Sequence, residues 1–238
     1  MRIEGRPGPR TSGAAPSGAG VLPAGGELCG VSVRNVTSGA TEFTCNAYLV
    51  EGAVPTLIDA GAMPGVASEI ARHVDELDRV VITHQHGDHV AELEAVVDAF
   101  DPAVYAAGDH PRRTEPLADG DTIQVGDASS EVVTTPGHAD DHVSLVGQTA
   151  VFSGDVLVYD DGAFDDGSFG RTDMVGQSRE RLIESLRTLA DRIPASATRL
   201  YAGHGSVFDA DDHDDSLQTV VDRALERAER REPKYPEE

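Results

Sequence analysis

Short apolar runs alternate with longer amphipathic stretches along the chain, a pattern typical of a protein that contains both strands and helices. The runs rich in Val, Ile and Leu predict strands at Gly30–Val36, Asn46–Val50, Pro55–Ile58, Val80–Thr83, Ala103–Ala106, Thr122–Val125, Glu131–Thr134, Val143–Val146, Ala150–Phe152 and Arg199–Ala202. Apolar residues spaced three and four apart predict helices at Gly65–Leu77, Val90–Phe100, Arg179–Ile193 and Asp215–Arg230. This order of elements fits two mixed sheets packed face to face, with helices outside.

The 238 residues are enough for one domain with a substantial core, and no internal domain boundary is visible. Residues 1–27 are rich in Gly, Pro, Ala and Ser, which predicts a flexible tail before a single domain at residues 28–238. The tail lacks the apolar core of a secretory signal, and no run approaches the roughly 20 apolar residues that span a bilayer. We therefore expect a cytoplasmic protein without a membrane partner, in which Cys29 and Cys45 are buried free thiols.

The charge balance is strongly acidic, with 42 acidic residues against 19 basic ones and a net charge of −23. Nucleic-acid binding needs clustered Lys and Arg, so this composition argues against a nucleic-acid partner. Repulsion among these charges is screened within about 3 Å at 1 M salt. The composition therefore favours a salt-adapted protein with a halophilic acidic surface over an ordinary acidic one.

The segment Thr83-His84-Gln85-His86-Gly87-Asp88-His89 carries four potential metal ligands directly after an apolar run. Alternate side chains of an extended segment point the same way, so His84 and His86 can face one ion. Asp88 and His89 follow a glycine, where the chain turns, and can face a second ion. Imidazole and carboxylate are ligand types that suit zinc and neighbouring transition metals.

Three later fragments repeat this arrangement of a strand end, a glycine and a metal-ligand side chain. They are Pro136-Gly137-His138, Gly154-Asp155 and Gly203-His204-Gly205. Glycine lets the backbone turn sharply and approach an ion closely. Side chains at the ends of strands are also held on rigid elements, as a metal site requires.

Together with Leu57-Ile58-Asp59-Ala60-Gly61, these motifs resemble the metallo-β-lactamase-fold hydrolases over roughly residues 30 to 210. The resemblance implies a four-layer αββα sandwich of two mixed sheets flanked by helices, with a two-metal site at one edge. It places His84, His86 and His138 on one ion, Asp88, His89 and His204 on the other, Asp155 between them, and Asp59 behind a ligand histidine as acceptor of its second ring N–H.

The loop Gly167-Ser168-Phe169-Gly170-Arg171-Thr172-Asp173 looks like the Gly-Arg-Thr-Asp segment of glyoxalase II-like thioesterases and of persulfide dioxygenases. Arg171 either locks this loop by pairing with Asp173 or binds a substrate carboxylate, and we favour the locking role. Phe164 and Phe169 are candidate walls of a substrate pocket. Among the remaining histidines, which match no ligand position, His110 and His142 could lie near the site.

The resemblance implies a glyoxalase II-like hydrolase with two divalent ions, zinc first and iron or manganese as alternatives. The ions would share a hydroxide that attacks the carbonyl of a small-molecule thioester or ester, with Asp88 assisting proton transfer. The first alternative is a persulfide dioxygenase with one Fe(II) on His84, His138 and Asp155. A lactonase and a non-catalytic metal-binding protein also remain open.

The sequence differs from three related groups of enzymes, and these differences narrow the expected class of substrate. Only 34 residues follow His204, and they lack the basic helical extension with which long glyoxalase II enzymes hold glutathione, so the thiol carrier stays open. Secreted β-lactamases of this fold usually carry cysteine where Asp155 stands, which argues against antibiotic hydrolysis. His204 follows Asp155 by 49 positions, which leaves no room for the inserted domain of the nuclease branch.

Overall fold

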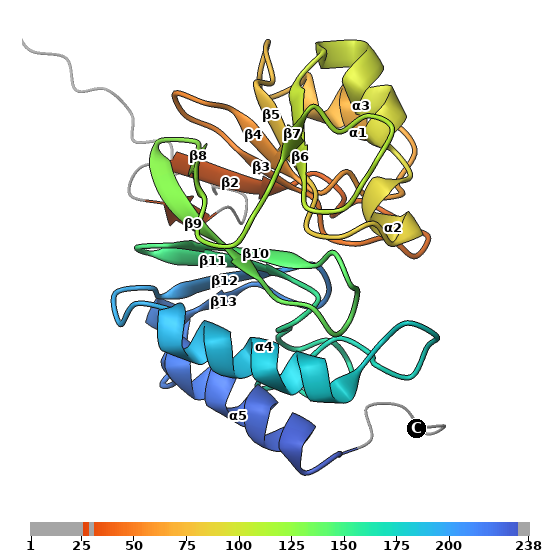
Figure 1. Ribbon diagram of the computed structural model, residues 1–238. Coiled ribbons are helices and arrows are strands. Elements are labelled where there is room, and N and C mark those ends of the chain that lie inside the picture. The colour runs from red at the N-terminus through yellow and green to blue at the C-terminus, as the bar shows by residue number, and fades with distance from the viewer. Residues whose placement is uncertain (1–25, 29–30, 233–238) are drawn as a thin grey trace, which may run out of the picture.

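The computed structural model describes residues 26–28 and 31–232, and the remaining residues lie outside the described part of the chain. Two sheets lie face to face, with helices on the outer side of each (Figure 1). The first sheet follows chain order: β1 (Gly26–Leu28), β2 (Val31–Asn35), β3 (Tyr48–Val50), β4 (Thr56–Ile58), β5 (Arg79–Val81), β6 (Ala103–Ala106) and β7 (Glu115–Pro116). The second has the order β13 (Phe208–Asp209), β12 (Arg199–Ala202), β11 (Ala150–Gly154), β10 (Val143–Gly147), β9 (Ala128–Thr134) and β8 (Thr122–Val125).

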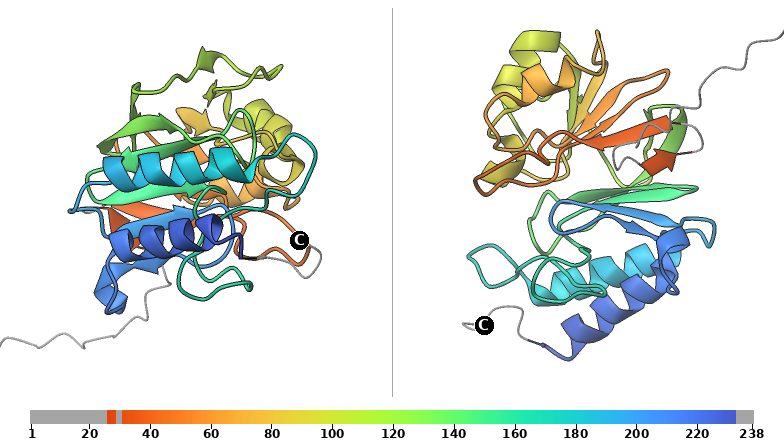
Figure 2. Two further views of the ribbon diagram at one scale, coloured as in Figure 1. Left: turned by 60° about the horizontal axis from the view of Figure 1, so that its bottom comes forward. Right: turned by 180° about the vertical axis from the view of Figure 1, so that it is seen from behind.

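Within residues 26–28 and 31–232, five α-helices complete the four layers, which are also visible in Figure 2. The first sheet is covered by α1 (Val66–Ile70), α2 (Gly87–Val90) and α3 (Leu93–Phe100), and the second by α4 (Arg179–Arg192) and α5 (Leu217–Glu229); a 3-10 helix, Ala210–Asp212, follows β13. The predicted αββα sandwich of two mixed sheets is therefore confirmed.

Apolar side chains fill three layers between these four structural layers. Val81 and Phe152 belong to the middle layer, which both sheets supply. Val80 shares the layer between the first sheet and its helices with Val96 of α3. Because neighbouring residues of a strand point to opposite faces, β5 can serve both layers. Leu186 of α4 belongs to the third layer, beneath the second sheet.

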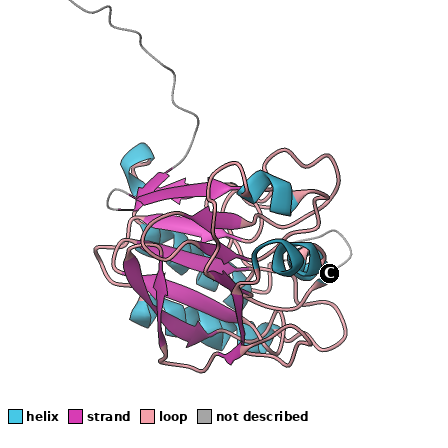
Figure 3. Ribbon diagram, turned by 90° about the horizontal axis from the view of Figure 1, so that it is seen from above, coloured by secondary structure: helices cyan, strands magenta, loops and turns pink. Residues whose placement is uncertain are grey.

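The carboxyl ends of several strands meet at one edge of the sandwich. Strands β4, β5, β6 and β7 pair in parallel in the first sheet, and β11 pairs in parallel with β12 in the second. Parallel strands present their carboxyl ends at the same edge, and loops gather at one end of the strands (Figure 3). The histidine-rich segment after β5 therefore lies near the segments that follow β11 and β12.

Two predicted helices differ from those observed. The helix predicted at Gly65–Leu77 ends at Ile70, where the N–H groups of Arg72 and His73 bond only three residues back in a tight turn. The helix predicted at Val90–Phe100 is divided between α2 and α3. The backbone N–H of Glu92 bonds to the carbonyl of Gly61 instead of continuing the helix. Strands β7 and β13, with two residues each, are too short for an alternating pattern and were not predicted.

The N-terminal segment is described only in part. Strand β1 begins at Gly26, two residues before the predicted start of the domain, and residues 1–25 of the predicted tail lie outside the described residues. Cys45 is a buried free thiol, as predicted, whereas Cys29 also lies outside. Within the described ranges, no helix combines the length and apolar character needed to traverse a bilayer.

Candidate metal centre

Three histidine rings from the two sheets converge on one point. His84 and His86 follow β5, and His138 follows β9. The Nδ1 atom of His86 lies 3.0 Å from Nε2 of His84 and 2.9 Å from Nε2 of His138. Three ring nitrogens this close can bind a single cation.

A second group forms beside the first. Asp88 and His89 lie on α2, and His204 follows β12. The Nε2 atom of His204 lies 3.1 Å from Oδ2 of Asp88, and Nε2 of His89 lies 3.9 Å from the same oxygen. These three side chains can also hold one cation.

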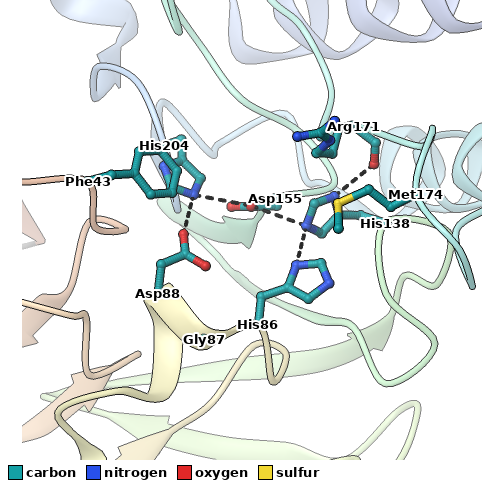
Figure 4. Close-up of a pocket in the computed structure, with 10 residues that line it drawn as sticks. Phe43, His86, Gly87, Asp88, His138, Asp155, Arg171, Met174 and His204 are labelled. Atoms are coloured by element: carbon teal, nitrogen blue, oxygen red, sulfur yellow. Dashed lines mark hydrogen bonds and ion pairs between the residues drawn. The ribbon is translucent and has the colours of Figure 1, made fainter. Parts of the chain in front are cut away.

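The carboxylate of Asp155, directly after β11, lies between the two groups (Figure 4). Its Oδ2 atom is 3.4 Å from Nε2 of His138 in the first group. The same oxygen is 3.4 Å from Nε2 of His204 in the second group, and Oδ1 is 3.5 Å from Nε2 of His89. All seven side chains predicted from the sequence are therefore brought together.

Asp59 lies behind the two ligand groups and orients His89 directly and His84 through Thr83. Its Oδ2 atom accepts the Nδ1–H of His89 at 2.8 Å and the hydroxyl of Thr83 at 2.7 Å, and Oδ1 accepts the backbone N–H of Thr83. Because the Thr83 hydroxyl donates to Asp59, its oxygen can accept the Nδ1–H of His84, 3.1 Å away. This pattern leaves Nε2 of both histidines free to face the centre.

His138 is held in the same manner by the backbone. Its Nδ1–H donates to the carbonyl of Arg171 at 2.9 Å, so Nε2 is the nitrogen with a free lone pair. The loop that contains Arg171 thus orients a histidine through its main chain, whatever its side chain does.

Unpartnered atoms show that the centre suits a cation. Nε2 of His89 and Oδ1 of Asp155 are buried without a hydrogen-bond partner among the described residues. A buried acceptor without a donor is costly, and a bound cation would satisfy both atoms. Imidazole nitrogens and carboxylate oxygens are ligands of zinc, iron and manganese, so the residues present fit divalent metal ions.

The pKa shifts agree with this interpretation. Burial lowers the pKa values of His84 and His138, which keeps these rings neutral, the form that binds a metal. Burial alone raises the pKa of Asp155, but the charges of His89 and His204 outweigh it and hold that pKa well below its usual range. At His89 burial lowers the pKa, yet Cys45 and two carboxylates raise it well above normal, so without a metal ion the ring favours the protonated form, and a metal ion at Nε2 would displace that proton.

His142 lies beside the centre, as the sequence allowed, although it matched no ligand position and its role was not predicted. Its Nε2 atom accepts the backbone N–H of Asp155 at 2.9 Å, and its Nδ1–H donates to Oγ1 of Thr135 at 2.8 Å. Burial lowers the pKa of His142 to about 3, so the ring stays neutral and keeps its acceptor. The signal in the sequence is a histidine directly before the apolar run of β10.

A glycine permits the close packing around Asp155. A Cβ atom at Gly203 would lie 2.2 Å from Oδ1 of Asp155 and 2.8 Å from Cε1 of His89. Neither atom could retreat without leaving the centre, because both belong to potential metal ligands. Glycine is therefore required before His204, as its position in the sequence motif suggested.

The centre opens into a pocket of about 520 Å³. Its lining comprises Phe43, His86, Gly87, Asp88, His138, Asp155, Gly170, Arg171, Met174 and His204. Arg171 donates from Nε and Nη2 to the carboxylate of Asp173 at 2.8 and 2.7 Å, the arrangement of a loop lock. The pair is partly exposed.

The two predicted aromatic walls lie elsewhere. Phe169 is fully buried in the layer beneath the second sheet, since its loop folds onto α5: a Cβ at Gly167 would lie 2.6 Å from the carbonyl of Val220. Phe164 packs under the guanidinium of Arg227, 4.4 Å from the ring centre. Both expectations for the pocket wall are thus corrected.

Phe43 and Met174 are the apolar residues that do line the pocket, and the sequence argument missed them. Both lie on loops, where no periodic pattern distinguishes an exposed apolar residue that lines a pocket from one that does not. Their signal is visible only once the loops are placed beside His204 and His138 (Figure 4).

Comparisons with known proteins agree with this geometry. Residues 40–120 match the family model of the metallo-beta-lactamase superfamily. The hydroxyacylglutathione hydrolase of Aliivibrio fischeri (strain MJ11) is 31% identical over 152 residues, which cover 62% of this chain and 56% of that enzyme. The chain thus spans about half the length of that relative.

Solved structures share the fold. ETHE1 from Myxococcus xanthus superposes with a TM-score of 0.64 at 23% identity, covering 83% of this chain and 91% of that one. TTHA1623, solved in a di-iron-bound form, gives a TM-score of 0.56 at 28% identity, covering 69% and 89%. The matched family model and the αββα architecture show the metallo-beta-lactamase fold, and the chain is distantly related to the hydroxyacylglutathione hydrolases.

Proposed function

We propose that the protein is a metal-dependent hydrolase that cleaves a thioester or ester at a centre of two divalent cations. The observation that carries the proposal is the position of Asp155, whose carboxylate lies within 3.5 Å of nitrogens in both ligand groups. One cation would be held by His84, His86 and His138, the other by Asp88, His89 and His204, and Asp155 would serve both.

The chain's own residues set the conditions for hydrolysis. When bound, divalent cations supply Lewis acidity and lower the pKa of water from 15.7 toward about 7. Asp59 holds the ring of His89 so that Nε2 faces the centre. Burial raises the pKa of Asp88, but a hydrogen bond from His204 and the charge of His89 bring it below its usual value. Asp88 is thus ionised at neutral pH, which suits a metal ligand better than a proton donor.

The choice of a thioester rests on the relative whose name states its substrate class, hydroxyacylglutathione hydrolase. The choice of metal rests on the ligand types, which suit zinc, iron and manganese, and on the di-iron form in which TTHA1623 was solved. Zinc is our first choice because no ligand in the group requires a redox-active metal.

Metal analysis paired with a hydrolysis assay tests the proposal. The protein, purified in high salt, is expected to contain two metal ions and to hydrolyse thioesters, and chelation is expected to abolish turnover. His86→Ala should lose metal and activity together, whereas His73→Ala, which removes an exposed histidine after α1, should lose neither. One iron per chain, with oxygen uptake on a persulfide and no hydrolysis, would replace this proposal by a dioxygenase.

A further inference from the structure

Four large apolar side chains are exposed in the described part of the chain, and two of them line the same pocket. The four are Phe43, Met174, Val175 and Val207. Phe43 and Met174 are 79% and 53% exposed, and both border the candidate metal centre. Single exposed apolar residues are common on protein surfaces, but two that share one pocket indicate a binding surface.

The two side chains lie on different sides of the pocket (Figure 4). Phe43, from the loop between β2 and β3, stacks on the ring of His204 with ring centres 5.1 Å apart and planes 14° apart. Met174, from the loop before α4, lies beside His138 and Arg171. A substrate placed with its reactive carbonyl near Asp155 would therefore have an apolar wall on either side.

The pocket offers little to a charged substrate. Among the described residues of its lining, Arg171 is the one Lys or Arg side chain, and two of its N–H groups already donate to Asp173. The other ionisable lining residues are the candidate metal ligands, and the chain carries a net charge of −23. Recognition of a thiol carrier with carboxylates, such as glutathione, would need further basic groups, which the described lining does not contain.

We infer that the substrate is an uncharged, apolar thioester or ester and that Phe43 and Met174 select it by contact with its apolar arms. This inference rests on the proposed function and names the substrate class of the same site. Phe43 supplies a flat ring against which an aliphatic chain or a second ring can pack, and Met174 supplies a flexible thioether that adapts to different shapes.

Two substrate series test the inference. Acetyl, butyryl and hexanoyl esters of one neutral thiol vary the acyl arm, and neutral thiols of increasing size on one acyl group vary the other. We expect kcat/KM to rise about tenfold or more along at least one series, since each methylene removed from water contributes favourably. Lactoylglutathione should be a poorer substrate than the best neutral thioester.

Variants of Phe43 and Met174 test whether these residues cause the preference for apolar substrates. Phe43→Ala or Met174→Ala should reduce the hexanoyl-to-acetyl ratio of kcat/KM by about fivefold, a ratio that a loss of folded protein alone would leave unchanged. Phe43→Leu should restore part of the ratio. Val207→Ala removes an exposed apolar side chain that does not line the pocket, and it should keep the full ratio.

Binding of non-hydrolysable ketone analogues, measured by calorimetry on the metal-loaded protein, separates this inference from the proposed function. Binding that tightens with chain length, without hydrolysis of any thioester, would support the apolar subsite and overturn the proposed hydrolase. Hydrolysis that is indifferent to chain length, or that favours lactoylglutathione, would overturn the subsite and leave the hydrolase standing. If chain length affects neither binding nor hydrolysis, the apolar subsite is overturned as well.

Discussion

The floor and the rim of the pocket differ in burial and in hydrogen bonding. The floor, which we define as Asp59, Thr83 and His142, lies behind the ligands and outside the lining itself; it is buried, and each of its side chains bonds to a potential metal ligand or its backbone. The rim, which we define as Phe43, Arg171 and Met174, is largely exposed and lies on loops.

This difference assigns separate tasks to the two regions. A buried side chain with satisfied hydrogen bonds cannot move without leaving a polar group unpaired, so the floor fixes the ligand geometry. An exposed side chain on a loop can change at small cost in stability, so the rim can adapt to a substrate without disturbing the centre. Substitutions in the floor should therefore alter metal binding and stability, and substitutions in the rim should alter selectivity.

The largest effect is expected at the group that both regions surround. Asp155→Asn keeps the shape of the side chain but removes the charge shared by the two ligand groups. Since this charge would offset the repulsion between the two proposed cations, we expect loss of at least one metal ion and a fall in turnover of about 10²- to 10⁴-fold. Metal analysis and kcat measured on the same sample check this; full metal content with unaltered kcat would contradict the assigned position of Asp155.

Asp59→Asn should have the next largest effect. The substitution replaces the carboxylate that accepts from both His89 and Thr83, and the loss of a carboxylate that orients a metal-binding histidine typically costs about 10- to 100-fold in metal affinity or activity. The measurement is a competitive chelator titration. Asp173→Asn is the matched control, because it removes an exposed carboxylate at the rim and should leave metal affinity unchanged; equal losses in the two variants would remove the distinction between floor and rim.

His142 should reveal itself through stability and its pH dependence. His142→Phe leaves the backbone N–H of Asp155 without its acceptor, and we expect it to unfold more easily than His142→Gln by about 1–3 kcal/mol at pH 7. In the wild type, the pKa of His142 is lowered from 6.5 to about 3 by burial. Between these values the unfolded chain binds a proton that the folded one does not, so stability is present above pH 6.5 and is lost as pH falls.

His142→Gln removes this titration. Its free energy of unfolding should therefore fall less steeply than that of the wild type between pH 6 and 4, by up to about 1.4 kcal/mol per pH unit. Urea unfolding at several pH values measures the slopes. Identical slopes would mean that His142 is not held neutral in the folded protein.

The sequence alone predicted the metal ligands much better than the apolar residues of the rim. His138, Asp155 and His204 each follow an apolar run and a glycine, so their chemistry and their position at strand ends are both visible in the chain. The pocket-lining role of Met174 depends on how a long loop folds over the centre, and that path is set by tertiary contacts. The same dependence explains why Phe169, in the same loop, was predicted as a wall yet lies in the core.

The partners of individual buried hydrogen bonds are also not visible in the local sequence pattern. His142 precedes a strand that the apolar pattern predicts correctly, but its bond to Asp155 links β10 to β11. A contact of this kind depends on strand pairing and register, which the hydrophobic pattern restricts without fixing each pair.

The smallest expected effect is the salt dependence of stability, which should differ between the exposed Arg171–Asp173 pair and the buried Asp59–His89 pair. The exposed pair of Arg171 and Asp173 should contribute no more than about 1 kcal/mol in dilute buffer, and the difference between wild type and Asp173→Asn should shrink further in molar KCl, where charges are screened within about 3 Å. The cost of Asp59→Asn should persist in the same salt, because Asp59 and His89 are buried and little screened. The wild type itself should become more stable as KCl rises, since its net charge of −23 repels itself less. Thermal unfolding of the three proteins across the KCl series measures all of these effects. Wild-type stability that falls steadily with KCl would refute the predicted salt adaptation. Whether the stabilisation by Asp59 is independent of salt is judged separately, from the difference between wild type and Asp59→Asn.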